Sequence, residues 1–138
     1  MKKVAISIVG IIAFLCAFGC KAPYEEKEVL IGRDDISLTI KGEPVFVYDA
    51  DKCQTAYNVE RNEYRAMTDD ISEYFILKAD QNLSHVNQEF TADLTYTVNK
   101  KEKKASGLEF KIEKISNASG LVWLWCADKS IGLVVRVF

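Results

Sequence analysis

The sequence predicts an all-β protein, and we expect an antiparallel β-sandwich with an immunoglobulin-like or related Greek-key topology. Apolar and polar residues alternate over short segments, most clearly from Phe90 to Val98 and from Leu108 to Glu113. A period of two residues places one apolar face against a core and leaves the other face in water. No segment shows a sustained 3.6-residue period with helix caps, which argues against a helical domain.

Further segments have strand character, and polar or glycine-bearing turns separate them. In the first of them Ile36, Leu38 and Ile40 alternate with polar residues. Many short strands at close spacing are typical of a sandwich or a small barrel. A small lipocalin-like β-barrel is therefore the alternative fold. The further predicted strands are Ile36–Lys41, Val45–Tyr48, Cys53–Val59, Tyr64–Thr68, Ile71–Lys78, Leu121–Ala127 and Ile131–Phe138.

The last two predicted strands are apolar on both faces. The run Leu121–Cys126 has no charged residue, and the final strand has one, Arg136. Such runs are expected near the centre of a sheet that is covered on both sides. The polar break at Asp128 and Lys129 predicts that the two strands form a hairpin.

Trp123 and Trp125 are the candidate binding residues of this hairpin. They are two residues apart on a predicted strand, so their side chains point to the same face. If that face is exposed, the indoles form a flat platform for a sugar ring or an apolar partner. The alternative is that both are core residues, since tryptophan supplies a large buried area.

The N-terminus has the layout of a secretory signal peptide. Lys2 and Lys3 precede an uncharged run of about 15 residues, Val4–Phe18. This run is shorter than the roughly 20 residues that a membrane-spanning helix needs, although a membrane anchor is the alternative. We expect residues 1–19 to be removed.

The segment Ala17-Phe18-Gly19-Cys20 resembles the lipobox of bacterial lipoproteins. The resemblance implies cleavage before Cys20 and diacylation of its thiol, so that the mature protein is held on a membrane by its N-terminal lipid. Ordinary secretion would cut at the same place and leave Cys20 unmodified. The next residue is Lys21 rather than the aspartate that keeps many enterobacterial lipoproteins on the inner membrane. An outer-membrane lipoprotein, facing the periplasm or the surface, is the expectation.

The mature chain divides into a tether and one domain. Residues 20–28 are charged and contain one of the two prolines, which predicts a flexible lipidated tether. Residues 29–138 then form a single β domain. The C-terminal Trp-Leu-Trp strand resembles small lipoproteins of Bacteroidetes that have no assigned activity, and this implies location and fold alone.

Cys53 and Cys126 remain after the signal peptide and the lipid site are set aside. An even pair of cysteines in an oxidising compartment predicts a disulfide. Such a bond would close a long loop and contribute ~4 kcal/mol. The alternative is two separate thiols packed as small hydrophobic groups.

Composition and motifs argue against several functions. Without Lys2 and Lys3 the chain has 16 basic and 20 acidic residues, a net charge near −4, which disfavours nucleic acid. The single histidine, His85, lies in a predicted loop and has no partner in a nucleophilic triad. No zinc spacing or nucleotide-binding glycine motif occurs, so we expect no metal, no cofactor and no enzymatic activity.

We therefore expect a non-catalytic binding module of the cell envelope with a protein or glycan partner. One alternative is a structural or accessory subunit of an envelope complex that docks through a sheet edge such as Ile36–Lys41. Another is a small-ligand carrier with a barrel lumen.

Overall fold

The computed structural model describes residues 23–137, with side chains from Lys27 onward. In this part of the chain one helix precedes nine strands, which pair in the order β2-β1-β9-β8-β7-β6-β5-β4-β3. Every pairing is antiparallel, and the all-β prediction is confirmed. The elements are α1 (Pro23–Ile31), β1 (Ile36–Ile40), β2 (Glu43–Tyr48), β3 (Gln54–Asn58), β4 (Glu63–Met67), β5 (Tyr74–Ala79), β6 (Glu89–Val98), β7 (Lys101–Ser116), β8 (Leu121–Cys126) and β9 (Ile131–Arg136).

The strand order is a meander rather than a Greek key. From β3 to β9 each strand pairs with the next along the chain, because each polar turn reverses the chain directly onto its neighbour. Among the described strands, only β1 and β9 pair without being consecutive. This pairing places β1 between β2 and β9, so Ile36–Lys41 is not the sheet edge that the sequence suggests. The edges are β2 and β3.

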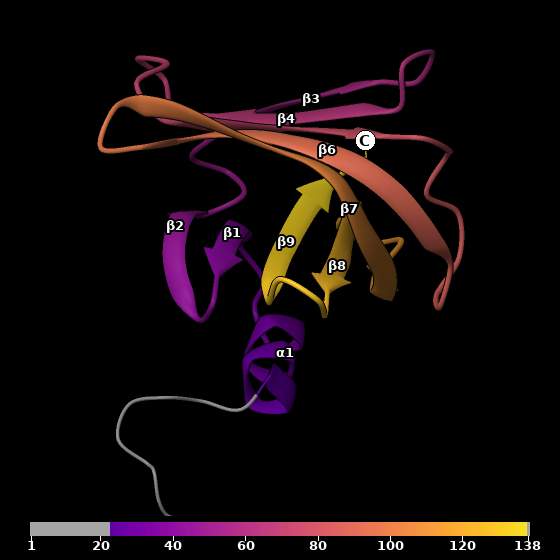
Figure 1. The fold of residues 1–138 in the computed structure, drawn as a ribbon. Coiled ribbons are helices and arrows are strands. Elements are labelled where there is room, and N and C mark those ends of the chain that lie inside the picture. Colours follow the sequence, from indigo (N-terminus) through magenta and orange to yellow (C-terminus); the bar gives the residue numbers. More distant parts are fainter. Residues whose placement is uncertain (1–22, 138) are drawn as a thin grey trace, which may run out of the picture.

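The sheet curls into a half-barrel, and Figure 1 shows two layers that cross steeply. The upper layer consists of β3 to β6 with residues 101–110 of β7. The lower layer consists of β1, β2, β8 and β9 with the rest of β7. Register shifts at Ala92/Leu94 and Ile112/Lys114 allow β6 and β7 to bend between the layers. At the first shift Gly107 has φ of 66°, and its N–H donates to the Asp93 carboxylate at 3.0 Å.

The space between the layers is filled by side chains. The rings of Phe46 on β2 and Phe75 on β5 meet edge to face at 5.3 Å. Phe90 on β6 stacks on Phe110 of β7 at 5.7 Å. Tyr64 of β4 is also buried against this core. Tyr64, Phe90 and Phe110 each lie between two outward polar neighbours, as the period of two predicts.

The lower layer is covered on its outer face by α1. All six residues of β8 and the first five of β9 are buried, and both strands lie in the interior of the sheet, near its centre as the doubly apolar runs predict. Leu30 of α1 lies on Gly132 of β9, where an added Cβ would come within 3.0 Å of the leucine side chain and of Thr39 Oγ1. A side chain at position 132 would therefore lift the helix from the sheet.

The helix occupies part of the segment that the sequence predicts as a tether. Pro23 is the first residue of α1. Proline is tolerated at this position because the N–H groups of the first helical turn have no partner within the helix. Among the described residues no helix is both long and apolar enough to cross a bilayer. The predicted signal peptide and the predicted lipid site at Cys20 lie outside the described residues.

Candidate functional site

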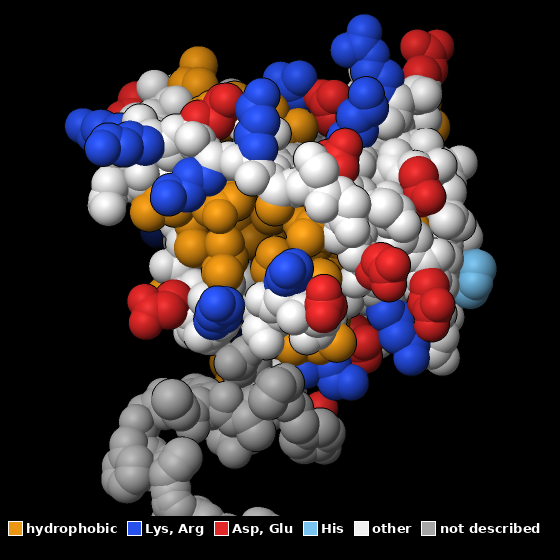
Figure 2. All heavy atoms as spheres, viewed as in Figure 1, with side chains coloured by type: hydrophobic (Ala, Val, Ile, Leu, Met, Phe, Trp, Pro, Cys, Tyr) orange, Lys and Arg blue, Asp and Glu red, His pale blue; other side chains and the backbone are white. Residues whose placement is uncertain are grey.

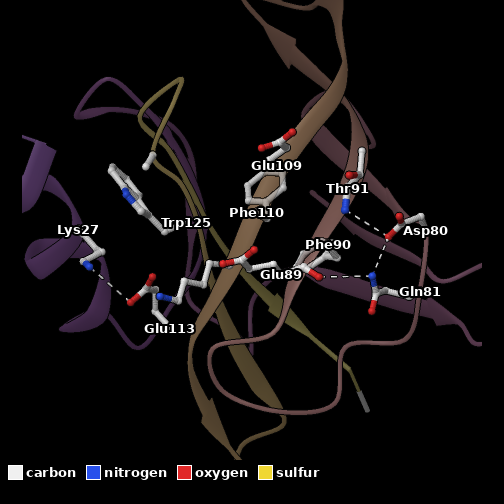
Figure 3. Close-up of a pocket in the computed structure, with 12 residues that line it drawn as sticks. Lys27, Asp80, Gln81, Glu89, Phe90, Thr91, Glu109, Phe110, Glu113 and Trp125 are labelled. Carbon is white, nitrogen blue, oxygen red and sulfur yellow. Dashed lines mark hydrogen bonds and ion pairs between the residues drawn. The ribbon is translucent and has the colours of Figure 1, made fainter.

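A groove of about 620 Å³ lies on the outer face of the sheet, beside α1. Figure 3 shows Lys27 and Trp125 on one side of it and Asp80 and Gln81 on the other. Its floor comes from β6, β7 and β8, so it joins elements that are far apart in the sequence. The lining side chains include Lys27, Asp80, Gln81, Glu89, Phe90, Glu109, Phe110, Lys111, Glu113 and Trp125.

The charged floor of the groove follows from the strand register. Glu89 of β6 is directly opposite Lys111 of β7, and Lys111 is directly opposite Trp125 of β8. Directly opposite residues share one face of a sheet with Cβ atoms about 5 Å apart. The Lys111 side chain therefore lies between a carboxylate and an indole. Glu109 lies on the same face, two residues before Lys111.

Both sides of the groove are fixed by polar contacts. Lys27 Nζ lies 3.6 Å from Glu113 Oε1, which ties α1 to β7. On the other side the Asp80 carboxylate accepts from the Thr91 N–H at 3.2 Å and from Gln81 Nε2 at 3.3 Å. Each wall is thus tied to a strand of the floor, α1 to β7 through Lys27 and Asp80 to β6 through Thr91.

The floor residues, in contrast, are available to a ligand. Within residues 27–137 the side chains of Glu89, Glu109 and Lys111 have no hydrogen-bond or ion-pair partner. All three are exposed. A ligand in the groove would thus meet two hydrogen-bond acceptors, one ammonium donor and an apolar ring within one patch.

A buried glutamine organises the loop that leads into the groove. Gln88 accepts from the Ser84 N–H at 2.7 Å and donates to the Asn82 carbonyl at 2.6 Å. It also donates to Gln81 Oε1 at 2.9 Å. His85 belongs to this loop and is exposed, with Nδ1 at 3.0 Å from Ser84 Oγ, but it does not line the groove.

The two tryptophans do not form an exposed platform. Trp123 is 1% exposed: its Nε1–H donates to the Arg33 carbonyl at 2.9 Å and Lys114 Nζ lies 4.4 Å from its ring centroid. Trp125 is 6% exposed and lies at the border between α1 and the groove. The helix covers the face of β8 on which both tryptophans lie. Trp123 therefore belongs to the core, and Trp125 contributes only a ring edge to the groove.

The predicted disulfide between Cys53 and Cys126 is not formed. Both thiols are free. Cys126 ends β8 and Cys53 precedes β3, and four strands separate β8 from β3 in the sheet. Cys53 also lies near Arg136, at the end of β9 that pairs with Leu121, whereas Cys126 pairs with Ile131 at the other end of the hairpin. The two cysteines therefore do not approach within the Cα distance of about 4.4–6.8 Å that a disulfide requires. Burial raises the pKa of the Cys53 thiol, with Asp49 and Asp69 adding to the rise and Arg136 opposing it.

Two pairs of adjacent aspartates in the turns, Asp34-Asp35 and Asp69-Asp70, do not line the groove. Among the described residues no group of three or more His, Cys, Asp or Glu side chains is arranged to hold a metal ion. Asp70 illustrates the local use of these carboxylates: Ser72 through Oγ–H and N–H, and Thr68 through Oγ1–H, all donate to it. These hydrogen bonds, with those from Ser72 the strongest, lower the pKa of Asp70 to about 2.

The groove contains residues that sequence reasoning did not single out. The alternation from Leu108 to Glu113 predicts that Glu109 and Lys111 lie on the solvent face of a strand, and both are exposed there. The alternation predicts the face on which these two residues lie, but it does not predict that Lys27 and Gln81 lie on either side of them. Comparisons of the chain with protein-family models, with curated proteins and with solved structures give no match. The groove is therefore interpreted from its own chemistry.

Proposed function

We propose that the protein is a non-catalytic binding module of the cell envelope, and that its groove binds a glycan. The observation that carries this proposal is the set of polar side chains of Glu89, Glu109 and Lys111 beside the edge of Trp125, which have no hydrogen-bond or ion-pair partner within residues 27–137. Carboxylates accept hydrogen bonds from sugar hydroxyls and an ammonium donates to them. The edge of Trp125 adds a small apolar contact.

The charge of the groove narrows the class of glycan. Four carboxylates, those of Asp80, Glu89, Glu109 and Glu113, face two ammonium groups, those of Lys27 and Lys111. This excess of negative charge disfavours uronic acids and other acidic sugars. A neutral or amino-bearing glycan fits the groove better.

The filled interior supports a surface site rather than a carrier lumen. The Phe46 and Phe75 rings meet where a lipocalin-like barrel would need space. The sheet also has two open edges, β2 and β3, instead of a closed circle of strands. For these reasons we favour a sandwich-like architecture over the closed barrel as the finer description of the fold.

The proposed location rests on the N-terminal sequence. Lipid on Cys20 would anchor the chain close to Pro23, where α1 begins, and α1 is one wall of the groove. The groove would then lie on the membrane-proximal side of the domain. The intact mass of the mature protein tests this part separately, because an unmodified Cys20 would remove the anchor.

Calorimetric titration of the full chain with three oligosaccharide probes tests the glycan groove. We expect saturable binding of a chito-oligosaccharide or its deacetylated form and no binding of an oligogalacturonate. Replacing Glu109→Gln together with Lys111→Gln should weaken binding at least tenfold. Lys78→Gln is the matched control, because Lys78 is an exposed lysine on β5 outside the groove. Equal binding by both variants, or preference for the acidic probe, would contradict the proposal.

A further inference from the structure

Strand β7, the middle strand of the sheet, has one edge that is unpaired along its first part. Residues Lys111 to Ser116 of β7 pair with β8, whereas residues 101–110 pair with β6 alone. The free edge arises because β7 bends from the upper to the lower layer, while β8 stays in the lower layer. In Figure 1 this part of β7 borders the opening between the layers.

The free edge is accessible along most of its length. Six of the residues from Lys101 to Gly107 are exposed and Ala105 is half-buried. On the unpaired side of an antiparallel strand, every second residue directs its N–H and C=O outward, which makes the edge a template for another strand. Asn99 and Lys100 have φ of 53° and 67°, as a tight two-residue turn requires, so the hairpin tip holds the edge in place.

The edge has a strong positive charge. Lys100, Lys101, Lys103 and Lys104 are exposed, and Glu102 is the one acidic residue among them. The Glu102 carboxylate accepts a hydrogen bond from the Tyr74 hydroxyl and lies 3.9 Å from Lys104 Nζ. The remaining lysines have no ion-pair partner within residues 27–137. An incoming strand with acidic side chains would supply one.

Apolar side chains lie beside the edge. Figure 2 shows a hydrophobic surface in the opening between the layers, with Lys or Arg side chains around it. From the upper layer Tyr96, opposite Lys103, and Ala105, opposite Leu94, are half-buried on the inner face. From the lower layer Ile40 ends β1 and is also half-buried. A strand on the edge would direct alternate side chains into this opening.

We propose that residues 101–109 of β7 are a docking edge for an extended segment of a partner protein with acidic residues at alternate positions. Lys101 and Lys103 are opposite Val98 and Tyr96 and so share one face of the strand, where such residues would meet them. Backbone pairing gives such a segment affinity, and the lysines select its charge. A second copy of this chain is a poor occupant, because edge-to-edge pairing would bring lysines close to lysines. Of residues 101–109 only Glu109 also lines the glycan groove, and the lysines that select the partner lie outside it.

The test uses full-length protein and an eight-residue peptide that alternates glutamate with valine. We expect saturable binding that slows amide exchange of β7 residues 101–109. A peptide with lysine in place of glutamate, and one with proline at two central positions, should bind at least tenfold more weakly. The protein variant Lys101→Glu/Lys103→Glu should lose binding, while Lys78→Glu should retain it. Circular dichroism checks that both variants remain folded.

Three outcomes would overturn the proposal. The first is equal binding of the glutamate and lysine peptides. The second is binding of the glutamate peptide, or of vesicles with anionic lipid, without any change in amide exchange of β7, because the lysines would then be a simple polyanion patch. The third is protection of the edge in the protein alone with formation of a dimer, because a second copy would then be the occupant.

Discussion

The β8–β9 hairpin and the β6–β7 hairpin have the same antiparallel pairing and opposite surroundings. In β8–β9 both faces are covered, by the upper layer inside and by α1 outside. At the tip of β6–β7 one edge and most side chains face water. The comparison shows that one sheet combines a stable centre with an accessible margin. The stability of the domain should depend on the first hairpin, and recognition on the second.

The largest expected effect is at the covered hairpin. Replacing Trp123→Ala removes a ring that is 1% exposed and its hydrogen bond to Arg33, and should lower the free energy of unfolding by about 3–5 kcal/mol. Urea denaturation measures this. The matched variant at the other hairpin, Lys103→Ala, should stay within about 0.5 kcal/mol of the wild type. Similar losses in both variants would contradict the difference between the hairpins.

An intermediate effect is expected where α1 meets β9. Gly132→Ala adds a methyl group within 3.0 Å of Leu30 and Thr39 and should cost about 1–3 kcal/mol. Because the clash is with Leu30, the double variant Gly132→Ala/Leu30→Ala should lose less stability than the sum of the two single variants. Strict additivity in this cycle would mean that the helix does not rest on Gly132.

A smaller effect, of opposite sign, is expected at the exposed tip. Lys100 has φ of 67°, which strains an L-residue, so Lys100→Gly should stabilise the protein by about 1 kcal/mol. Lys101→Gly is the control, because Lys101 is in the strand ladder and a glycine there weakens a strand. Destabilisation by both glycines would show that the turn has another geometry.

The smallest expected effect is electrostatic and lies in the turn before β5. Hydrogen bonds from Ser72 and Thr68 lower the pKa of Asp70 from 3.8 to about 2. A lowered pKa in the folded state adds stability above pH 4, and this is lost as the pH falls toward 2. Asp70→Asn should therefore lower the melting temperature at pH 7 and have no effect below pH 2. Ser72→Ala should show a weaker form of the same pH dependence.

Much of the fold could be predicted because alternation is a local signal. The inward residues from Phe90 to Leu94 and from Leu108 to Ile112 are buried as their period of two requires. The buried centre at Leu121–Cys126 follows from its lack of polar residues. The start of β7 was missed, because the lysines from Lys100 to Lys104 have the composition of a loop although they pair with β6.

The candidate site could not be predicted because it depends on contacts between distant segments. The helix at Pro23–Ile31 has no amphipathic pattern from which it could be predicted. Its packing depends on Leu30 and on Gly132, which has no side chain to keep the helix away from the sheet. That packing buries Trp123 and makes Lys27 a wall of the groove. The free edge of β7 likewise depends on the register between β7 and β8, in which Lys111 is the first residue of β7 to pair with β8. No local sequence pattern specifies this register.

Residue-resolved amide hydrogen exchange of the protein alone tests the contrast between the two hairpins most directly. We expect slow exchange throughout β8 and β9, and between residues 101 and 110 an alternation of slower amides paired with β6 and fast amides on the free side. Uniform protection of residues 101–116 would mean that another segment covers the edge. It would contradict the account of β7 as a strand that is half enclosed and half open.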